Sequence, residues 1–257
     1  MTLVTTLSVA QGGERIVVVS PHLDDGVLSL GASIASWSQA GTTVELLTVL
    51  ACDPDSTAPA GGWDRRGGFA TEGESARARR EEDRRACAVL GATPIWLPFG
   101  SVDYERHGDE WEIRRAALEA LRGADLVLVP GAPVTHPDHE WLVRTLLADG
   151  LDRGRLALYA EQPYTRRTAA QPRLPGWLSD ALGGAWPLAH ASTRLRDRIA
   201  KWRAIRCYRS QLPLLGMYRS LRRGPHRYAL APELVAWHPN LASTSSRRRV
   251  ARRLARR

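Results

Sequence analysis

Short apolar runs that alternate with longer helical segments constrain the fold of this chain more than any other feature. Each run is almost continuously apolar, as in IVVVS, and such runs are typical of strands buried on both faces of a parallel sheet. Glycine follows directly after several helical segments, where it can cap a helix. The apolar runs are residues 16–20, 44–50, 94–99, 125–130 and 156–163, and the helical segments are residues 27–41, 74–91, 112–125 and 140–150.

This alternation predicts an α/β protein with a Rossmann-like architecture, in which helices cover both faces of a mostly parallel sheet in three layers, α/β/α. The chain has 257 residues, which is compatible with one such domain, and we expect that domain to span residues 1–246. The pattern weakens after residue 165, where we still expect a helix over 197–211 and a final strand over 233–239.

The net charge of +9 is concentrated at one end of the chain. Seven of the 36 basic residues lie within 247–257, RRRVARRLARR, so the rest of the chain is close to neutral. Such a tail could bind nucleic acid, anionic lipid or an acidic partner. A solvated, disordered terminus or a short helix is the simpler interpretation, and we do not expect nucleic acid to be the main partner.

Several features predict a soluble cytoplasmic protein. No apolar stretch approaches the roughly 18 residues of a membrane span. The first residues, MTLVTTLSVAQGGER, lack the pattern of a secretory signal. Cys52, Cys87 and Cys207 are too widely spaced for a disulfide framework or a zinc knuckle, so we expect ordinary free thiols.

Residues 52–75 are rich in glycine, proline and small polar residues. A loop of this length inside a compact domain is usually functional or disordered, and we expect it to serve as a substrate lid. Trp63 within it is the first candidate for an aromatic platform under a sugar ring, although most tryptophans serve in packing.

Two clusters of metal-ligand side chains each follow a predicted strand. SPHLDDG leaves the first strand, and THPDHE follows the fourth strand after a short loop. Because ligands of open α/β sheets bind beyond the carboxyl ends of the strands, both clusters should lie in the same crevice. The first cluster contains His22, Asp24 and Asp25, and the second contains His136, Asp138 and His139.

A catalytic zinc ion takes three histidine or carboxylate ligands and keeps a fourth position for water. His22, one of the two aspartates and one of the two later histidines would supply this set, and the remaining carboxylate and histidine would be free for proton transfer. A dication would also offset the repulsion between Asp24 and Asp25. The alternative for the first cluster alone is an aspartate that caps the following helix.

The two clusters resemble the signature motifs of the PIG-L/LmbE-like metal-dependent deacetylases, His-Pro-Asp-Asp-Glu and His-Pro-Asp-His. The resemblance continues through RREEDRRACAVLGA, FGSVDYE, YAEQPY and KWRAIRCYRSQ, and covers about residues 14–212. It implies a zinc ion, with Fe²⁺ as an alternative, bound by His22, Asp25 and His139.

The resemblance also implies roles for other residues. Asp24 would be the general base, and His136 would assist as an acid or as a stabiliser of the oxyanion. Arg79 and Asp103 would contact the sugar. Asp138 lies between the two histidines of its motif, and we expect it to orient one of them from outside the ligand set.

The sequence departs from the family pattern at a few positions. Leu23 stands in place of the usual proline and should leave the turn intact, whereas Gly26 replaces the usual glutamate and removes a carboxylate next to the site. Val134 stands where some relatives that act on thiol-pathway sugars carry a tyrosine, so its side chain can make no oxyanion contact.

These features predict a zinc-dependent N-deacetylase that hydrolyses the acetamide, or another short acyl amide, of an N-acetylglucosamine-type sugar within a larger conjugate. We expect that conjugate to be a secondary metabolite such as an antibiotic. The alternative is a non-catalytic binding or regulatory protein that retains a metal and docks a partner or nucleic acid with its tail. A hydrolase of esters or phosphates is disfavoured because the chain lacks a glycine-rich phosphate loop.

Overall fold

The computed structural model describes residues 14–148, 150–166, 172–217 and 231–242, so the arginine-rich tail lies outside the described residues. The strands are β1 (Arg15–Ser20), β2 (Thr43–Thr48), β3 (Thr93–Trp96), β4 (Leu126–Ala132), β5 (Leu156–Ala160), β6 (Leu188–His190) and β7 (Leu234–Trp237). The helices are α1 (Asp25–Gln39), α2 (Gly62–Arg66), α3 (Glu72–Leu90), α4 (Glu110–Ala120), α5 (Pro137–Ala148), α6 (Gly176–Ala181), α7 (Leu195–Ile205) and α10 (Pro239–Ala242), with short 3₁₀ turns at η1 (Val102–Tyr104), η2 (Arg153–Arg155) and η3 (Tyr164–Arg166).

One seven-stranded sheet organises the described residues, with the order β3-β2-β1-β4-β5-β7-β6. The first five strands pair in parallel, and β7 runs antiparallel to both β5 and β6. The mostly parallel Rossmann-like sheet is therefore confirmed. The strand order reverses between β1 and β4, where a crevice opens at the carboxyl ends of the strands.

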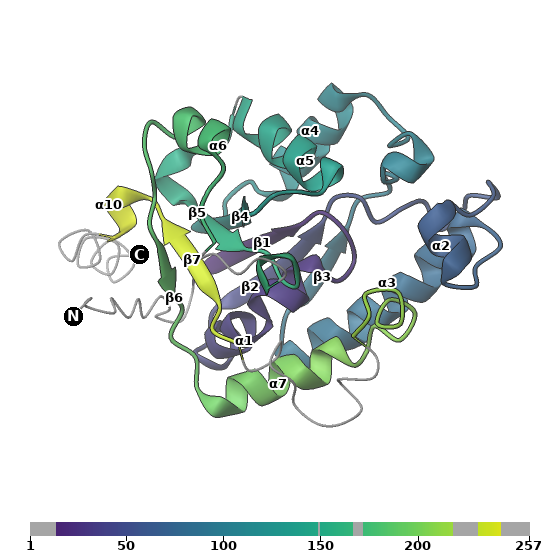
Figure 1. Cartoon of the computed structure of the whole chain (residues 1–257), viewed down its shortest axis with the longest axis horizontal. Coiled ribbons are helices and arrows are strands. Elements are labelled where there is room, and N and C mark those ends of the chain that lie inside the picture. Colours follow the sequence, from purple (N-terminus) through teal and green to yellow (C-terminus); the bar gives the residue numbers. More distant parts are fainter. Residues whose placement is uncertain (1–13, 149, 167–171, 218–230, 243–257) are drawn as a thin grey trace.

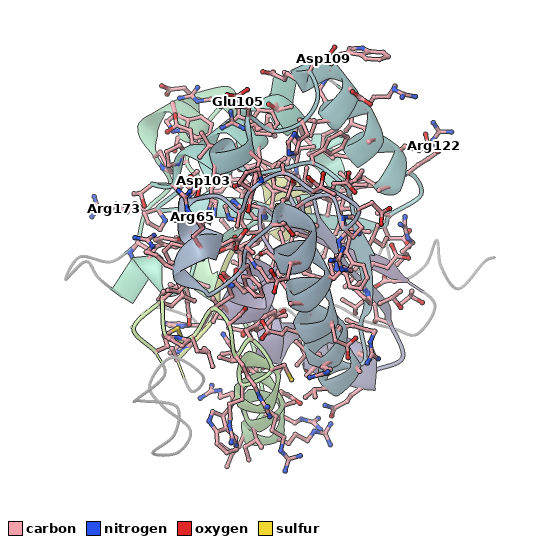
Figure 2. All side chains as sticks on the ribbon, turned by 90° about the vertical axis from the view of Figure 1, so that its right-hand side faces the viewer. Arg65, Asp103, Glu105, Asp109, Arg122 and Arg173 are labelled. Carbon is pink, nitrogen blue, oxygen red and sulfur yellow. The ribbon has the colours of Figure 1, made fainter. Side chains whose placement is uncertain are left out.

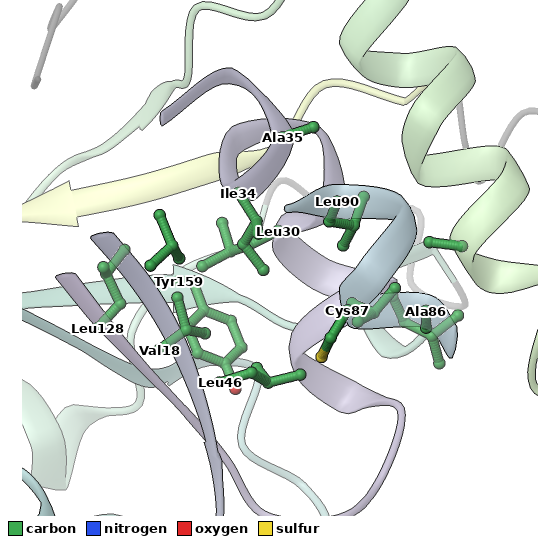
Figure 3. Packing of buried hydrophobic residues seen from close by; sticks show 14 of the residues in the cluster. Val18, Leu30, Ile34, Ala35, Leu46, Ala86, Cys87, Leu90, Leu128 and Tyr159 are labelled. Atoms are coloured by element: carbon green, nitrogen blue, oxygen red, sulfur yellow. The ribbon is translucent and has the colours of Figure 1, made fainter. Parts of the chain in front are cut away.

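Helices cover both faces of this sheet. Figure 1 shows α1, α3 and α7 against one face and α4 and α5 against the other. The sequence of β1 explains why both faces are covered, because alternate side chains of a strand point to opposite faces. Ile16 and Val18 belong to the core under α1 and α3, whereas Val17 and Val19 belong to the core under α4 and α5. Figure 3 shows the first core, in which Leu30 and Ile34 pack near Val18 and Tyr159.

The only lysine of the chain forms a buried ion pair within this framework. Lys201 Nζ in α7 lies 2.7 Å from Glu233 Oε1, and both side chains are 0% exposed. The Glu233 carboxylate also accepts hydrogen bonds from the backbone N–H groups of Ala32 and Ser33 in α1. The pair thus ties α1 to α7 and to the segment before β7.

The segment over 52–75 differs from the loop that its composition predicts. It contains α2 and the first residues of α3, which begins at Glu72 because Thr71 Oγ1 caps it by accepting a hydrogen bond from Glu74 N at 3.1 Å. The Thr-x-x-Glu spacing is that of a capping box, but the Glu74 carboxylate accepts its hydrogen bond from Ala70 N, one residue before the cap, and not from Thr71 N.

Two further expectations concern membranes and thiols. In the described part of the chain, no helix has the length and apolar character needed to span a bilayer. Cys52, Cys87 and Cys207 are free thiols, as the spacing predicts.

Candidate metal centre and active-site pocket

The two histidine-containing motifs meet at the point where the strand order reverses. β1 and β4 are parallel neighbours, with Val17 opposite Val127. The turn after β1 carries the first motif, and the loop after β4 leads into α5, which carries the second. The expectation that the two motifs share one crevice is therefore confirmed by the sheet topology.

The turn after β1 is tightly built. Ser20 Oγ donates a hydrogen bond to His22 O at 2.6 Å and accepts one from Gly26 N at 2.9 Å. Asp24 has φ 146°, a conformation that non-glycine residues rarely adopt and that often marks functional sites. Within the described residues its carboxylate caps no N–H group of α1, so capping does not account for this aspartate.

Three ligand atoms form a small triangle at the centre of the site. Asp25 Oδ2 lies 3.2 Å from His22 Nδ1 and 3.2 Å from His139 Nε2, and the two nitrogens are 3.3 Å apart. Tetrahedral zinc with ligand distances of about 2.0–2.1 Å places its ligand atoms about 3.3–3.4 Å from one another. The described side chains therefore fit a zinc ion above this triangle.

His136 lies close to the same centre. Ligand atoms of His22, His136 and His139 all lie within 4.8 Å of one another, so three histidines form a second possible ligand set. However, His136 Nδ1 accepts a hydrogen bond from Asp138 N at 3.2 Å, and its side chain is 34% exposed toward the pocket. The triangle with Asp25 is the tighter set.

Each histidine of the triangle contacts a carboxylate through its other ring nitrogen. His22 Nε2 lies 3.0 Å from Asp138 Oδ2, and His139 Nδ1 contacts Glu161 Oε1. Carboxylates in this position fix the tautomer and orientation of a metal-binding imidazole. The sequence suggested His136 or His139 as the partner of Asp138. The Asp138 carboxylate lies closest to His22 in the structure, and His136 Nδ1 lies 4.0 Å from the same oxygen.

The charges of the cluster show why a cation would be favourable there. Burial and the neighbouring Asp25 carboxylate raise the pKa of Asp24 to about 8. Although burial opposes ionisation, His139 and His22 hold the pKa of Asp25 well below its usual range. Burial likewise opposes the charge of His139, but Asp25 and Glu161 raise its pKa well above the usual value. Without an ion the carboxylates thus draw protons onto the histidines, and a dication would supply the same positive charge.

A pocket of about 310 Å³ opens beside the triangle. It is lined by all the predicted site residues except the fully buried His139. Arg79 and Asp103, which the resemblance assigns to sugar binding, also contact α2. Arg79 Nη1 lies 3.1 Å from Asp64 Oδ1, and Asp103 Oδ2 accepts a hydrogen bond from Trp63 N at 3.1 Å. Asp103 lies in η1 and Arg65 in α2, and Figure 2 labels both residues on the same side of the molecule.

α2 is fastened to the pocket wall by specific contacts. Asp64 is its only buried residue, and its carboxylate also accepts a hydrogen bond from Tyr104 Oη at 2.6 Å. The indole Nε1 of Trp63 donates to Gln211 Oε1 at 2.7 Å. The segment predicted as a lid therefore forms part of the pocket, with Trp63 in its lining.

The sequence model of the PIG-L family, described as GlcNAc-PI de-N-acetylase, matches residues 17–148. This match covers more than half of the 257 residues and contains both histidine motifs. The chain belongs to the PIG-L family. A search of curated proteins found none that matches the sequence.

Solved structures place this PIG-L protein near several deacetylases. It is similar to the A40926 pseudoaglycone deacetylase Dbv21, with 28% identity, a TM-score of 0.68, and coverage of 87% of this chain and 96% of Dbv21. It is also similar to a triple mutant of Orf2, a deacetylase of the teicoplanin biosynthetic pathway, with 26% identity, a TM-score of 0.67, and coverage of 86% and 96%.

The fold by itself does not identify the reaction of a PIG-L protein. GalB from Pseudomonas putida KT2440, a 4-carboxy-2-hydroxymuconate hydratase, shares it with 19% identity and a TM-score of 0.56 over 87% of this chain and 95% of GalB. The chemistry must therefore be argued from the side chains of the site.

Gly26 departs from the family glutamate for a reason that the structure makes visible. A Cβ atom at this position would come within 2.4 Å of Leu46 Cδ1 and 3.4 Å of Ser20. Position 26 thus faces β2 and the end of β1, and Leu46 fills the space that a side chain would need. The carboxylate lost from the motif is replaced here by apolar packing.

Glu161 also belongs to this site, although the sequence analysis assigns it no role. It directly follows β5, 22 positions after His139, and is 1% exposed. It lies in YAEQPY, one of the stretches that carry the family resemblance, but this signal names no partner for its carboxylate.

Proposed function

We propose that this protein is a zinc-dependent N-deacetylase that hydrolyses the acetamide, or a short acyl amide, of an N-acetylglucosamine-type sugar in a larger conjugate. The observation that carries the proposal is the triangle of Asp25 Oδ2, His22 Nδ1 and His139 Nε2, with edges of 3.2–3.3 Å beside the pocket. Membership of the PIG-L family and the likeness to Dbv21 support a deacetylase.

These three atoms would hold the ion. When bound there, zinc polarises an acyl carbonyl and lowers the pKa of water to about 7. Fe²⁺ accepts the same imidazole and carboxylate ligands and is the alternative metal.

Asp24 would act as the general base. Its pKa is about 8 without an ion, and a dication beside it would lower this pKa and favour the ionised carboxylate that a base requires. Asp24 lines the pocket beside Asp25, and 7% of the residue is exposed. It would take a proton from water while the water oxygen adds to the carbonyl carbon. When the C–N bond breaks, Asp24 would return this proton to the departing nitrogen, so that acetate and the free amine leave.

His136 would stabilise the oxyanion as a neutral hydrogen-bond donor. Burial and the nearby His22 and His139 lower its pKa to about 4, so the ring is neutral near pH 7. Because Nδ1 accepts from Asp138 N, the single ring proton lies on Nε2. This N–H can donate to the carbonyl oxygen as negative charge develops there. Of the two roles that the resemblance leaves open, the hydrogen-bond pattern favours the oxyanion donor.

Polar and aromatic groups around the pocket would bind the sugar. Arg79 lines the pocket, and its buried Nε has no hydrogen-bond partner among the described residues, so the protein does not use every donor of this guanidinium. Trp63 lines the same pocket and offers an aromatic surface. One similar protein is an A40926 pseudoaglycone deacetylase, and another is a deacetylase of the teicoplanin biosynthetic pathway. An antibiotic-type glycoconjugate is therefore the substrate class we propose.

The first experiment measures metal content and acetate release in one preparation, with a panel of N-acetylglucosamine conjugates as substrates. Near-stoichiometric zinc or iron together with acetate release is the expected result. Bound metal without release from any conjugate would favour the binding-protein alternative, and no bound metal after metal-replete purification would contradict the proposal.

A further inference from the structure

We infer that Glu161 is a positioning residue that fixes the His139 ring for metal binding, and that the strained backbone of Val134 holds Glu161 in place. The inference rests on the metal centre of the proposed function. It adds a third chain segment to the site, since Glu161 follows β5 whereas the ligands follow β1 and begin α5.

Both carboxylate oxygens of Glu161 are used. Oε1 contacts His139 Nδ1, and Oε2 accepts a hydrogen bond from Val134 N at 2.8 Å. The backbone N–H of Glu161 donates to Ala132 O at 2.6 Å. With 1% of the residue exposed, water cannot replace these partners, so the carboxylate is held in one orientation.

This arrangement leaves the His139 ring one orientation as well. His139 is 0% exposed, and its two nitrogens face opposite partners, with Nδ1 toward Glu161 and Nε2 toward the triangle. An ionised carboxylate can only accept, so the proton of a neutral His139 must lie on Nδ1. The Nε2 lone pair is then directed at the position of the ion, and the carboxylate increases its basicity as a ligand.

The backbone N–H of Val134 holds the Glu161 carboxylate in place. Val134 has φ 51°, which is a strong outlier for a β-branched residue, and it is 3% exposed. Such conformations persist only where surrounding contacts enforce them, and they concentrate at functional sites. In this conformation the Val134 N–H group donates its hydrogen bond to Glu161 Oε2. The position at which some relatives carry a tyrosine therefore contributes through its backbone in this chain.

The substitution Glu161→Gln tests the inference. It keeps the size of the side chain but replaces one acceptor oxygen by an NH₂ group, so either Val134 N–H or His139 Nδ1–H loses its acceptor. Zinc affinity is measured by competition with a chromophoric chelator, and the visible spectrum of the Co²⁺-loaded protein reports ligand geometry. We expect the variant to bind zinc about 10- to 100-fold more weakly, with an altered Co²⁺ spectrum.

Glu140→Gln is the matched control. Glu140 is the neighbour of His139 in α5, but its carboxylate is 41% exposed and pairs with Arg144. This variant should bind zinc as the unchanged protein does. Circular dichroism and the melting temperature of the metal-free proteins show whether each variant is folded. If Glu161→Gln does not fold, Glu161→Asp provides the test, because it keeps the charge but is too short to reach both donors.

The outcomes separate this inference from the proposed function. Equal zinc affinity and identical Co²⁺ spectra for the unchanged protein and a folded Glu161 variant would contradict the role of Glu161 and leave the metal centre intact. An equal loss in Glu140→Gln would also contradict it, since the effect would then be one of charge alone. Failure of the unchanged protein to bind zinc would overturn both proposals.

Discussion

The Asp138 carboxylate lies 3.0 Å from Nε2 of His22, although 116 positions separate the two residues in the chain. The contact joins the turn after β1 to the first turn of α5. The other oxygen of the Asp138 carboxylate lies 2.9 Å from Arg106 Nη2, so a residue from a third segment of the chain contacts the same carboxylate. The orientation of His22 therefore depends on a residue of the other motif, and substitutions at Asp138 should affect the proposed metal centre as well as stability.

Substitutions should divide the site into metal ligands and general base. We expect His22→Ala and His139→Ala to lose both bound metal and activity. Asp24→Asn should keep the metal because the three proposed ligands are unchanged, but kcat should fall by about 10²- to 10⁴-fold because no base remains. Metal analysis and acetate release on the same samples test this division. Equal metal loss in all three variants would mean that the two aspartates are assigned wrongly.

Asp138 should make the stability of the metal-free protein depend on acid pH. Although burial opposes its charge, the hydrogen bond and charge of His22, the Val102 N–H and nearby Arg106 lower its pKa to about 2, from an ordinary value of 3.8. A folded-state pKa below the unfolded one stabilises the protein above about pH 4, and this contribution is lost as the pH falls toward about 2.

Asp138→Asn should therefore lower the free energy of unfolding by about 2 kcal/mol near neutral pH, with a smaller difference at each lower pH. Urea titrations in the presence of a chelator, repeated at several pH values, measure this difference. A gap of constant size across the series would show that the ionisation of Asp138 does not stabilise the fold.

Trp63 should affect substrate binding more than turnover. Trp63 lines the pocket, and its indole donates a hydrogen bond to Gln211 rather than to a residue of the triangle. We expect Trp63→Ala to raise KM for N-acetylglucosamine conjugates roughly tenfold, equivalent to about 1.4 kcal/mol, with kcat nearly unchanged. Trp111→Ala is the control, since Trp111 is 61% exposed on α4. A fall in kcat without a change in KM would argue against a binding platform.

Gly26 should tolerate no side chain while Leu46 is present. We expect Gly26→Ala to destabilise the protein by about 1–3 kcal/mol, because its Cβ would overlap the Leu46 side chain. The double variant Gly26→Ala/Leu46→Ala should be more stable than the sum of the single changes predicts. Gly176→Ala, where no atom lies within 4 Å of the added Cβ, is the control for the general effect of such a change. Additive free energies at 26 and 46 would refute the packing explanation.

Removing one partner of the buried ion pair Lys201–Glu233 should destabilise the protein more than replacing both partners. Lys201→Met leaves Glu233 charged and buried, and we expect a loss of about 3–5 kcal/mol. Adding Glu233→Gln should recover part of this loss, because no uncompensated charge then remains. Thermal and urea unfolding of the single and double variants measure the coupling. A double variant less stable than Lys201→Met would contradict this account.

The sequence predicts the parts of this protein whose determinants are local. The apolar runs identify the five parallel strands, and the two motifs identify the side chains that meet between β1 and β4. β6 and α6 have three and six residues, too few for a periodic pattern. The start of α3 is set by the Thr71 cap, which lies within a stretch whose glycine content indicates a loop.

Long-range contacts account for what the sequence does not predict at the site. Glu161 lies in YAEQPY, a stretch that carries the resemblance but names no partner, and it reaches His139 because β5 lies beside β4. The pairing of Asp138 with His22 depends on the direction in which α5 presents each side chain. The packing of Leu46 against Gly26 likewise depends on the position of β2 relative to α1 and cannot be read from either segment alone.

Because Lys201 is buried, its chemical reactivity can report how often α1 and α7 separate. The chain has no other lysine, so it contains one ε-amino group, and this group is buried where α1 packs against α7. Amine-directed reagents can reach that group only when the two helices separate. The rate at which Lys201 is labelled therefore measures the frequency of these openings without any engineered probe.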